Sequence, residues 1–153
     1  MSPYPLEPAR AQGPMRFVIT TYPSRATALA AVESVLAARL AACANFVAIH
    51  SRYWWKEGVE SADESLVLFK TVPKRVGALF RHLESHHPYE VPEVVEVDVP
   101  RVGSKYLQYL AATIDPDAPP PPLGGGSMRR GAPRARGARA PARTRAPRRR
   151  RSK

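Results

Sequence analysis

Residues 44–72, ANFVAIHSRYWWKEGVESADESLVLFKTV, hold two strand-like segments joined by a short turn. The first segment, Ala44–Trp55, is rich in β-branched and aromatic side chains, and Gly58 marks the turn that follows it. The second segment, Ser65–Val72, is a nearly continuous apolar run, which is typical of a central strand. This stretch therefore predicts a β-hairpin whose second strand lies inside a sheet.

Apolar periodicity places one strand and one helix before this hairpin. Phe17–Tyr22 (FVITTY) is β-branched and aromatic, and Pro23 interrupts it. Ser24 is a good N-cap for a helix that runs to about Leu40. On one side of this helix, large apolar residues recur at helical spacing, at Leu29, Val32, Leu36 and Leu40.

Two further helices and one strand follow the hairpin. Pro73 fits the first turn of a helix that ends before Pro88, with its apolar positions at Val76, Leu79, Phe80 and Leu83. Glu93–Val99 alternates valines with acidic residues, which predicts a strand with one solvent-facing side. Ser104 is a candidate N-cap for a short helix whose apolar side holds Leu107, Leu110, Ala111 and Ile114.

The resulting order, β-α-β-β-α-β-α, indicates an α+β protein. Its simplest closed arrangement is a ferredoxin-like split βαβ sheet of four strands, with two helices packed on one face. In this arrangement we expect the first and third strands to be parallel neighbours.

Composition divides the chain into four parts. Residues 1–14 hold four prolines and no apolar period, so we expect a disordered leader, and Met15 is a more natural start. Residues 15–114 form the folded domain, and residues 115–128 are a linker rich in proline and glycine. Residues 129–153 lack side chains able to form a core, so we expect them to be disordered.

The C-terminal part also carries the excess positive charge. It holds 12 of the 24 Lys and Arg residues and no acidic residue, which leaves 12 basic and 13 acidic residues in residues 1–128. Such a segment can bind nucleic acid weakly and without sequence preference, most strongly through Arg148, Arg149, Arg150 and Arg151. The alternatives are a solvated solubility tail and the product of a GC-rich coding sequence.

Several classes of protein are excluded. No apolar run approaches the roughly 18–20 residues of a transmembrane helix, and the stretch before Met15 lacks the pattern of a secretory signal. A single cysteine, Cys43, excludes an internal disulfide and a cysteine-cluster zinc site, so we expect a cytoplasmic location. Cys43 fits a small buried hydrophobic residue, and no common catalytic motif occurs, so we expect no enzyme.

Tyr53, Trp54 and Trp55 stand together at the end of the first hairpin strand. Because strand side chains alternate, the two tryptophans point to opposite sides of the sheet, and one of them faces away from the helices. A loop or the third helix covers that tryptophan, or a partner subunit does. Aromatic residues are enriched in interface cores, which favours the subunit interface.

The densest polar cluster is SHHPYEVPE, Ser85–Glu93. It holds His86 and His87 at the end of a helix, and Glu90 and Glu93 beyond a turn stiffened by proline. Imidazole and carboxylate are ligands for Cu(II), Zn or Ni, so His86, His87 and Glu93 are candidate metal ligands. Neighbouring residues point in different directions, however, and a histidine at a helix C-terminus also interacts favourably with the helix dipole, which is the alternative.

Six short motifs are spread along residues 15–114: Thr-Tyr-Pro at 21–23, LAACAN at 40–45, SRYWW at 51–55, LVLFKT at 66–71, HPYEVPE at 87–93 and YLQYL at 106–110. Together they resemble the CutA family of divalent-cation tolerance proteins. The resemblance covers the whole predicted domain and neither terminal extension.

The resemblance implies a ferredoxin-like, PII-like fold that assembles as a homotrimer through its long hairpins. It also implies binding of Cu(II) or another divalent metal, without an organic cofactor, with His86 and His87 among the ligands. Members that bind metal have a further cysteine near the end of the first strand, where this sequence has Thr20. The leading function is a trimeric metal-binding protein, and the alternative is a PII-like module for a small anionic ligand or a protein partner.

Overall fold

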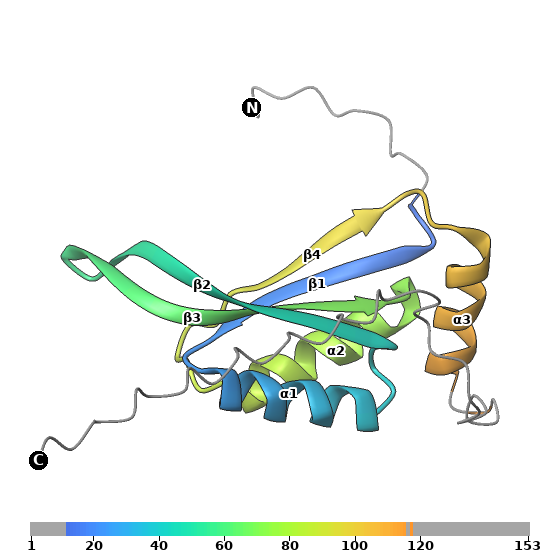
Figure 1. Cartoon of the computed structure of the whole chain (residues 1–153), viewed down its shortest axis with the longest axis horizontal. Helices are drawn as coiled ribbons and strands as arrows, with labels where there is room; N and C mark the ends of the chain where they lie inside the picture. The colour runs from blue at the N-terminus through green and yellow to red at the C-terminus, as the bar shows by residue number, and fades with distance from the viewer. Residues whose placement is uncertain (1–11, 116, 118–153) are drawn as a thin grey trace, which may run out of the picture. The chain divides into compact units, whose positions relative to one another are not determined.

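The computed structural model describes residues 12–115 and 117, and it contains the seven elements that the sequence predicts, in the predicted order. The predicted C-terminal tail, and most of the predicted linker and leader, lie outside these residues. The elements are β1 (Met15–Tyr22), α1 (Arg25–Ala37), β2 (Cys43–Trp55), β3 (Gly58–Thr71), α2 (Pro73–His86), β4 (Val94–Val99) and α3 (Ser104–Ile114). Figure 1 shows α1 and α2 on one side of a single sheet and α3 at one end of that sheet.

The sheet has the strand order β2-β3-β1-β4, and every neighbouring pair is antiparallel. The ferredoxin-like α+β class is therefore confirmed, but the expectation that β1 and β3 are parallel was wrong. In a split βαβ unit, the two strands joined by a helix run in the same direction but are not adjacent. Because β3 inserts between β1 and β2, it must run opposite to both.

The main core lies between the sheet and the two helices that cover it. Val18, Val67 and Phe69 point from the central strands toward α1 and α2 and are fully buried. Leu79 and Leu83 of α2 pack against them, as the apolar spacing of that helix predicts. This helix begins at a proline, which needs no amide hydrogen bond in the first turn.

Helix α1 begins as predicted but ends earlier and presents a different side to the core. Its buried residues are Ala28, Val32 and Val35, whereas two residues of the predicted apolar side, Leu29 and Leu36, are exposed. Residues 26–38 are apolar almost all round, so periodicity alone does not select the buried side. The small side chain of the buried Ala28 allows α1 to pack close to the sheet.

The ends of α1 are defined by hydrogen bonds. At the start, Ser24 Oγ accepts from the Thr27 amide, and the Ser24 amide donates to Thr27 Oγ1, which forms a reciprocal cap. At the end, the Leu40 amide donates to the Val35 carbonyl, and the Arg39 amide donates to the Leu36 carbonyl. These two bonds form a Schellman motif, with Arg39 at a φ of 50° in the position that glycine usually takes.

The hairpin formed by β2 and β3 is longer than predicted. Its second strand begins at Gly58 rather than at Ser65, and it remains paired with β2 out to Trp55 and Gly58. The additional residues, 58–64, are mostly polar and therefore gave no apolar signal. Strand pairing uses backbone groups, so it continues in a polar segment. Figure 1 shows this arm extending beyond the rest of the sheet.

The opposite face of the sheet is only partly covered. Helix α3 packs at one end of it, where Leu110 and Ile114 are buried with Met15. Farther along this face, Val47, Val95 and Val97 are 58%, 44% and 39% exposed. We predicted that the valines of β4 face the core and its acidic residues face solvent.

The acidic residues of β4 instead share a buried partner. Glu96 and Asp98 form ion pairs with Arg16, which is buried on the neighbouring strand β1. Arg16 also donates to the carbonyl of Gly13, whose amide donates to Asp98. The apolar side of β4 therefore lies on the open face, and the charged side is held by these contacts.

Candidate functional site

The aromatic residues of the hairpin arm lie on the surface of the single chain. Trp54 is 76% exposed, and Tyr53 and Trp55 are also exposed. In the described part of the chain, neither a loop nor α3 covers Trp54. The strand register places Trp54 on the same side of β2 as Phe46, so Trp55 is the tryptophan that faces away from the helices, and the subunit interface stays a prediction.

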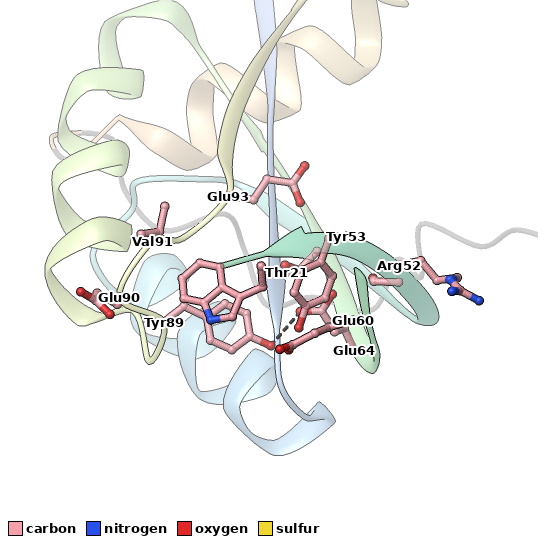
Figure 2. A pocket seen from close by; sticks show the side chains of 11 residues that line it. Thr21, Arg52, Tyr53, Glu60, Glu64, Tyr89, Glu90, Val91 and Glu93 are labelled. Carbon is pink, nitrogen blue, oxygen red and sulfur yellow. Dashed lines mark hydrogen bonds between the residues drawn. The ribbon is translucent and has the colours of Figure 1, made fainter. Parts of the chain in front are cut away.

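A cavity of about 550 Å³ opens beside this arm (Figure 2). It is lined by residues from the end of β1, from both strands of the arm and from the segment between α2 and β4. The lining residues are Thr21, Ser51, Arg52, Tyr53, Trp55, Glu60, Glu64, Tyr89, Glu90, Val91 and Glu93.

Acidic side chains dominate the charge of this cavity. Four glutamates line it, and Arg52 is the only basic residue that does so among the described residues. Figure 2 shows the Arg52 side chain directed away from the cavity and the Tyr89 hydroxyl directed at Glu64. That hydroxyl donates to Glu64 Oε1 at 2.7 Å, and burial, together with this carboxylate, raises the pKa of Tyr89. The cavity therefore favours a cation over an anion.

His87, one of the three predicted metal ligands, uses both of its ring nitrogens inside the chain. The Tyr89 amide donates to His87 Nδ1 at 3.1 Å, so Nδ1 carries no hydrogen and Nε2 must carry it. Nε2 then donates to Thr20 Oγ1 at 3.2 Å. The ring also stacks on Tyr22 with a centroid distance of 4.5 Å. Burial lowers the pKa of His87, which favours the neutral ring.

His86 lies on a different side of α2. Its Nδ1 is 2.8 Å from the carbonyl oxygen of His82, and the two imidazole rings are 4.7 Å apart. His82 Nε2 is 2.8 Å from Ser34 Oγ of α1, which holds the second ring against the neighbouring helix. Burial and the nearby His86 lower the pKa of His82. These two rings border a second cavity of about 340 Å³ between α1 and α2.

The structure therefore separates the predicted ligands. His87 contacts Thr20, the position where the resemblance implies a cysteine. His86 contacts His82, and Glu93 lines the acidic cavity. Within residues 12–115 and 117, no group of three or more His, Cys, Asp and Glu side chains is arranged to hold a metal ion.

His82 is the residue that sequence reasoning missed. The signal was present, because His82 and His86 are four residues apart in a segment predicted to be helical. Residues at this spacing lie on the same side of a helix. The adjacent pair, His86 and His87, is more conspicuous in the sequence, but it is the pair four residues apart that shares a side.

Two other sequence-based expectations concern Cys43 and the membrane. Cys43 is a half-buried free cysteine at the start of β2, and thus less buried than expected. Among the described residues, no helix combines the length and the apolar character needed to span a bilayer.

Comparison with known proteins identifies related chains. The family model described as "CutA1 divalent ion tolerance protein" matches residues 16–113. The rice protein "Protein CutA 1, chloroplastic" is 35% identical over 98 residues, which cover 63% of this chain and only 55% of the rice protein. "Divalent-cation tolerance protein CutA" from Thermotoga maritima is 33% identical over 100 residues, covering 65% of this chain and 99% of its own. The crystal structure of CutA1 from Oryza sativa superposes with a TM-score of 0.64 at 33% identity, covering 67% of this chain and 94% of the other.

Proposed function

The chain belongs to the CutA1 divalent ion tolerance protein family, and from that premise we propose that it acts as a homotrimer that binds a divalent metal such as Cu(II). The family description names tolerance of ions rather than a reaction, so we propose a binding protein rather than an enzyme. We also propose a cytoplasmic location, because a single free cysteine suits a reducing compartment. Cell fractionation tests that location.

One observation carries the metal-binding proposal. Three of the four histidines of the chain, His82, His86 and His87, lie within six residues at the C-terminal end of α2. Imidazole nitrogen is a strong ligand for Cu(II), and the C-terminus of a helix favours positive charge. The fourth histidine, His50, lies on β2 and pairs with Asp63 instead.

Isothermal titration with Cu(II) tests this proposal on the full-length chain without an affinity tag. We expect the wild type to bind Cu(II), and we expect replacement of His82, His86 and His87 by alanine to abolish binding. His50→Ala is the matched control, because it removes an exposed imidazole elsewhere and should leave binding unchanged. A wild type that takes up no Cu(II), or a triple variant that binds as well as the wild type, contradicts the proposal.

Two features support the proposed trimer. The open face of the sheet presents Val47, Val95 and Val97 to solvent, and the arm presents Trp54. Val47 and Trp54 point to opposite faces of β2, so they belong to two separate exposed apolar surfaces, and such surfaces are typical of interfaces. Tyr53, Trp54 and Trp55 are the proposed interface residues of the arm, as the sequence suggested.

Replacement of both Trp54 and Trp55 by alanine tests the role of the arm. Trp54 is 76% exposed and Trp55 is 37% exposed, so the double variant removes apolar area that the single chain leaves in solvent, and we expect the trimer to dissociate while each chain stays folded. Sedimentation velocity reports the mass, and circular dichroism reports the fold. Persistence of the trimer in the double variant contradicts an interface at the arm.

The alternative is a PII-like module that binds a small anionic ligand or a protein partner. The four glutamates around the larger cavity repel an anion, so this cavity supports the protein partner better than the small anion. Ligand uptake that is independent of metal, measured in the presence of a chelator, would favour this alternative.

A further inference from the structure

Two histidines at the C-terminal end of α2 specify which atoms would bind the proposed metal ion. His82 and His86 are one helical turn apart on the same side of α2, with ring centroids separated by 4.7 Å. Two histidines at this spacing can reach one metal ion, as they do in helical zinc sites. The spacing of His86 and His87 does not allow this, because adjacent residues on a helix point in different directions.

Hydrogen bonds set the tautomer of His86. Its Nδ1 lies 2.8 Å from the carbonyl oxygen of His82, and a carbonyl oxygen can only accept, so Nδ1 carries the hydrogen. The Ser85 hydroxyl gives the same result. Its single hydrogen is donated to the His82 carbonyl oxygen, so towards His86 Nδ1, at 2.9 Å, the hydroxyl oxygen can only accept. The lone pair of His86 is consequently on Nε2.

This arrangement is the one that metal-binding histidines usually have. A ligating histidine commonly donates its other ring N–H to a carbonyl or carboxylate group, which fixes the ring and makes the ligating nitrogen more basic. His82 Nε2 is 2.8 Å from Ser34 Oγ of α1, a hydroxyl that can donate or accept, and the tautomer in which Nε2 donates leaves Nδ1 of His82 for the metal. Both rings are therefore positioned by bonds that do not depend on a metal.

Space and charge at this end of the helix also suit a cation. The rings border a cavity of about 340 Å³, large enough for water ligands that complete the coordination of an ion. Unpaired carbonyl groups in the last turn of α2 give it a partial negative charge. Among divalent first-row metals, Cu(II) binds nitrogen ligands most strongly and accepts a square-planar geometry.

His87 is excluded from this site by its own contacts. Its Nδ1 accepts from the Tyr89 amide, and its Nε2 is bonded to Thr20. For His87 to bind a metal, one of these hydrogen bonds and the stacking on Tyr22 would have to break.

We propose that His82 and His86 form a two-histidine chelate for Cu(II) at the end of α2, and that His87 has a structural role instead. The inference rests on the proposed metal-binding function and specifies its ligands. It differs from the set that the resemblance implies, in which His86 and His87 act together.

Cu(II) titration of single variants of the full-length, tag-free protein tests the ligand set. Loss of a residue that only supports a ligand typically weakens metal binding by about 10- to 100-fold. Loss of a ligand should weaken metal binding at least as much as loss of a supporting residue. We therefore expect His82→Ala and His86→Ala each to weaken Cu(II) binding by at least about tenfold. We expect His87→Ala to weaken binding less than either of these variants, and the control His50→Ala to leave binding essentially unchanged. Circular dichroism confirms that each variant is folded.

Electron paramagnetic resonance of bound Cu(II) provides a second measurement, which does not depend on affinity. The wild type should show coupling to two imidazole nitrogens, and either His82→Ala or His86→Ala should show coupling to one. Wild-type binding that survives His82→Ala unchanged, or that is lost in His87→Ala, overturns the inference and leaves the proposed metal function standing. A wild type that binds no Cu(II) overturns both.

Discussion

The two faces of the sheet differ, although the same four strands build them. On the face toward α1 and α2, Val18, Val67 and Phe69 are fully buried, and two helices close the layer within one chain. On the other face α3 covers only one end, and Val47, Val95 and Val97 remain in contact with solvent. One face therefore provides the stability of the single chain, and the other leaves apolar area exposed, which the proposed trimer would bury.

The largest expected effect is on the covered face. Phe69→Ala removes a fully buried ring from the central strand β3 and should lower the free energy of unfolding by about 3–5 kcal/mol. Leu29→Ala is the control, because it removes apolar area from an exposed position of α1 and should change stability by about 0.5 kcal/mol or less. Chemical denaturation measures the free energy of unfolding of both variants. Equal losses in the two would contradict the conclusion that the covered face stabilises the single chain.

The second prediction concerns the open face. In the proposed trimer Val97→Asp buries an unpaired carboxylate, which costs several kcal/mol, so the trimer should dissociate into folded single chains. Leu29→Asp places the same charge on the covered side of the molecule, on the outer surface of α1, and should leave the assembly intact. Sedimentation velocity distinguishes these outcomes. A Val97→Asp protein that stays assembled would show that the open face is not an interface.

The third prediction uses the pH dependence of stability at the edge of the covered face. Burial lowers the pKa of His87 in the folded chain, so the unfolded chain binds the proton more readily. Stability should therefore be complete above the ordinary histidine pKa of about 6.5 and should fall as the pH drops below it. His87→Gln should make this fall shallower.

Chemical denaturation from mildly acidic to mildly alkaline pH measures this effect. His82 also has a lowered pKa and contributes to the wild-type curve, so the difference between wild type and His87→Gln isolates His87. Identical curves for the two proteins would contradict a lowered pKa of the half-buried His87.

The smallest expected effect lies outside both faces. The composition of the arginine-rich C-terminal segment, Arg148 to Arg151 included, predicts weak binding to polyanions and no role in the domain. Deletion of residues 124–153 should leave the thermal midpoint unchanged and abolish retention on DNA at low salt. A large drop in the midpoint would indicate that the segment packs on the domain.

Much of the fold could be predicted from the sequence, because local signals and packing agree there. Ser24 and Pro73 marked the starts of α1 and α2, and Leu79 and Leu83 marked the buried side of α2. The side of α1 was missed, because an alanine-rich helix offers apolar surface in every direction. The direction of β3 relative to β1 depends on which strand inserts between the others. That order is set by contacts between residues far apart in the sequence, so local patterns do not reveal it.

The site was less predictable, since it depends on where side chains point. His86 and His87 are adjacent in sequence, yet one meets His82 and the other meets Thr20. No local pattern reveals the Tyr89 amide that sets the tautomer of His87, because that bond forms only after the chain turns beyond α2. The polar outer half of β3 was missed for a related reason: its backbone pairs with β2, and backbone pairing leaves no apolar pattern in the sequence.

The central claim, that association of three chains closes the open face, is tested most directly by the mass of the wild-type protein in solution. Sedimentation equilibrium of the full-length chain at micromolar concentration should give three times the 16.9 kDa mass of one chain. A mass of 16.9 kDa that does not rise with concentration would contradict the account, because the valines of the open face would then stay in contact with water.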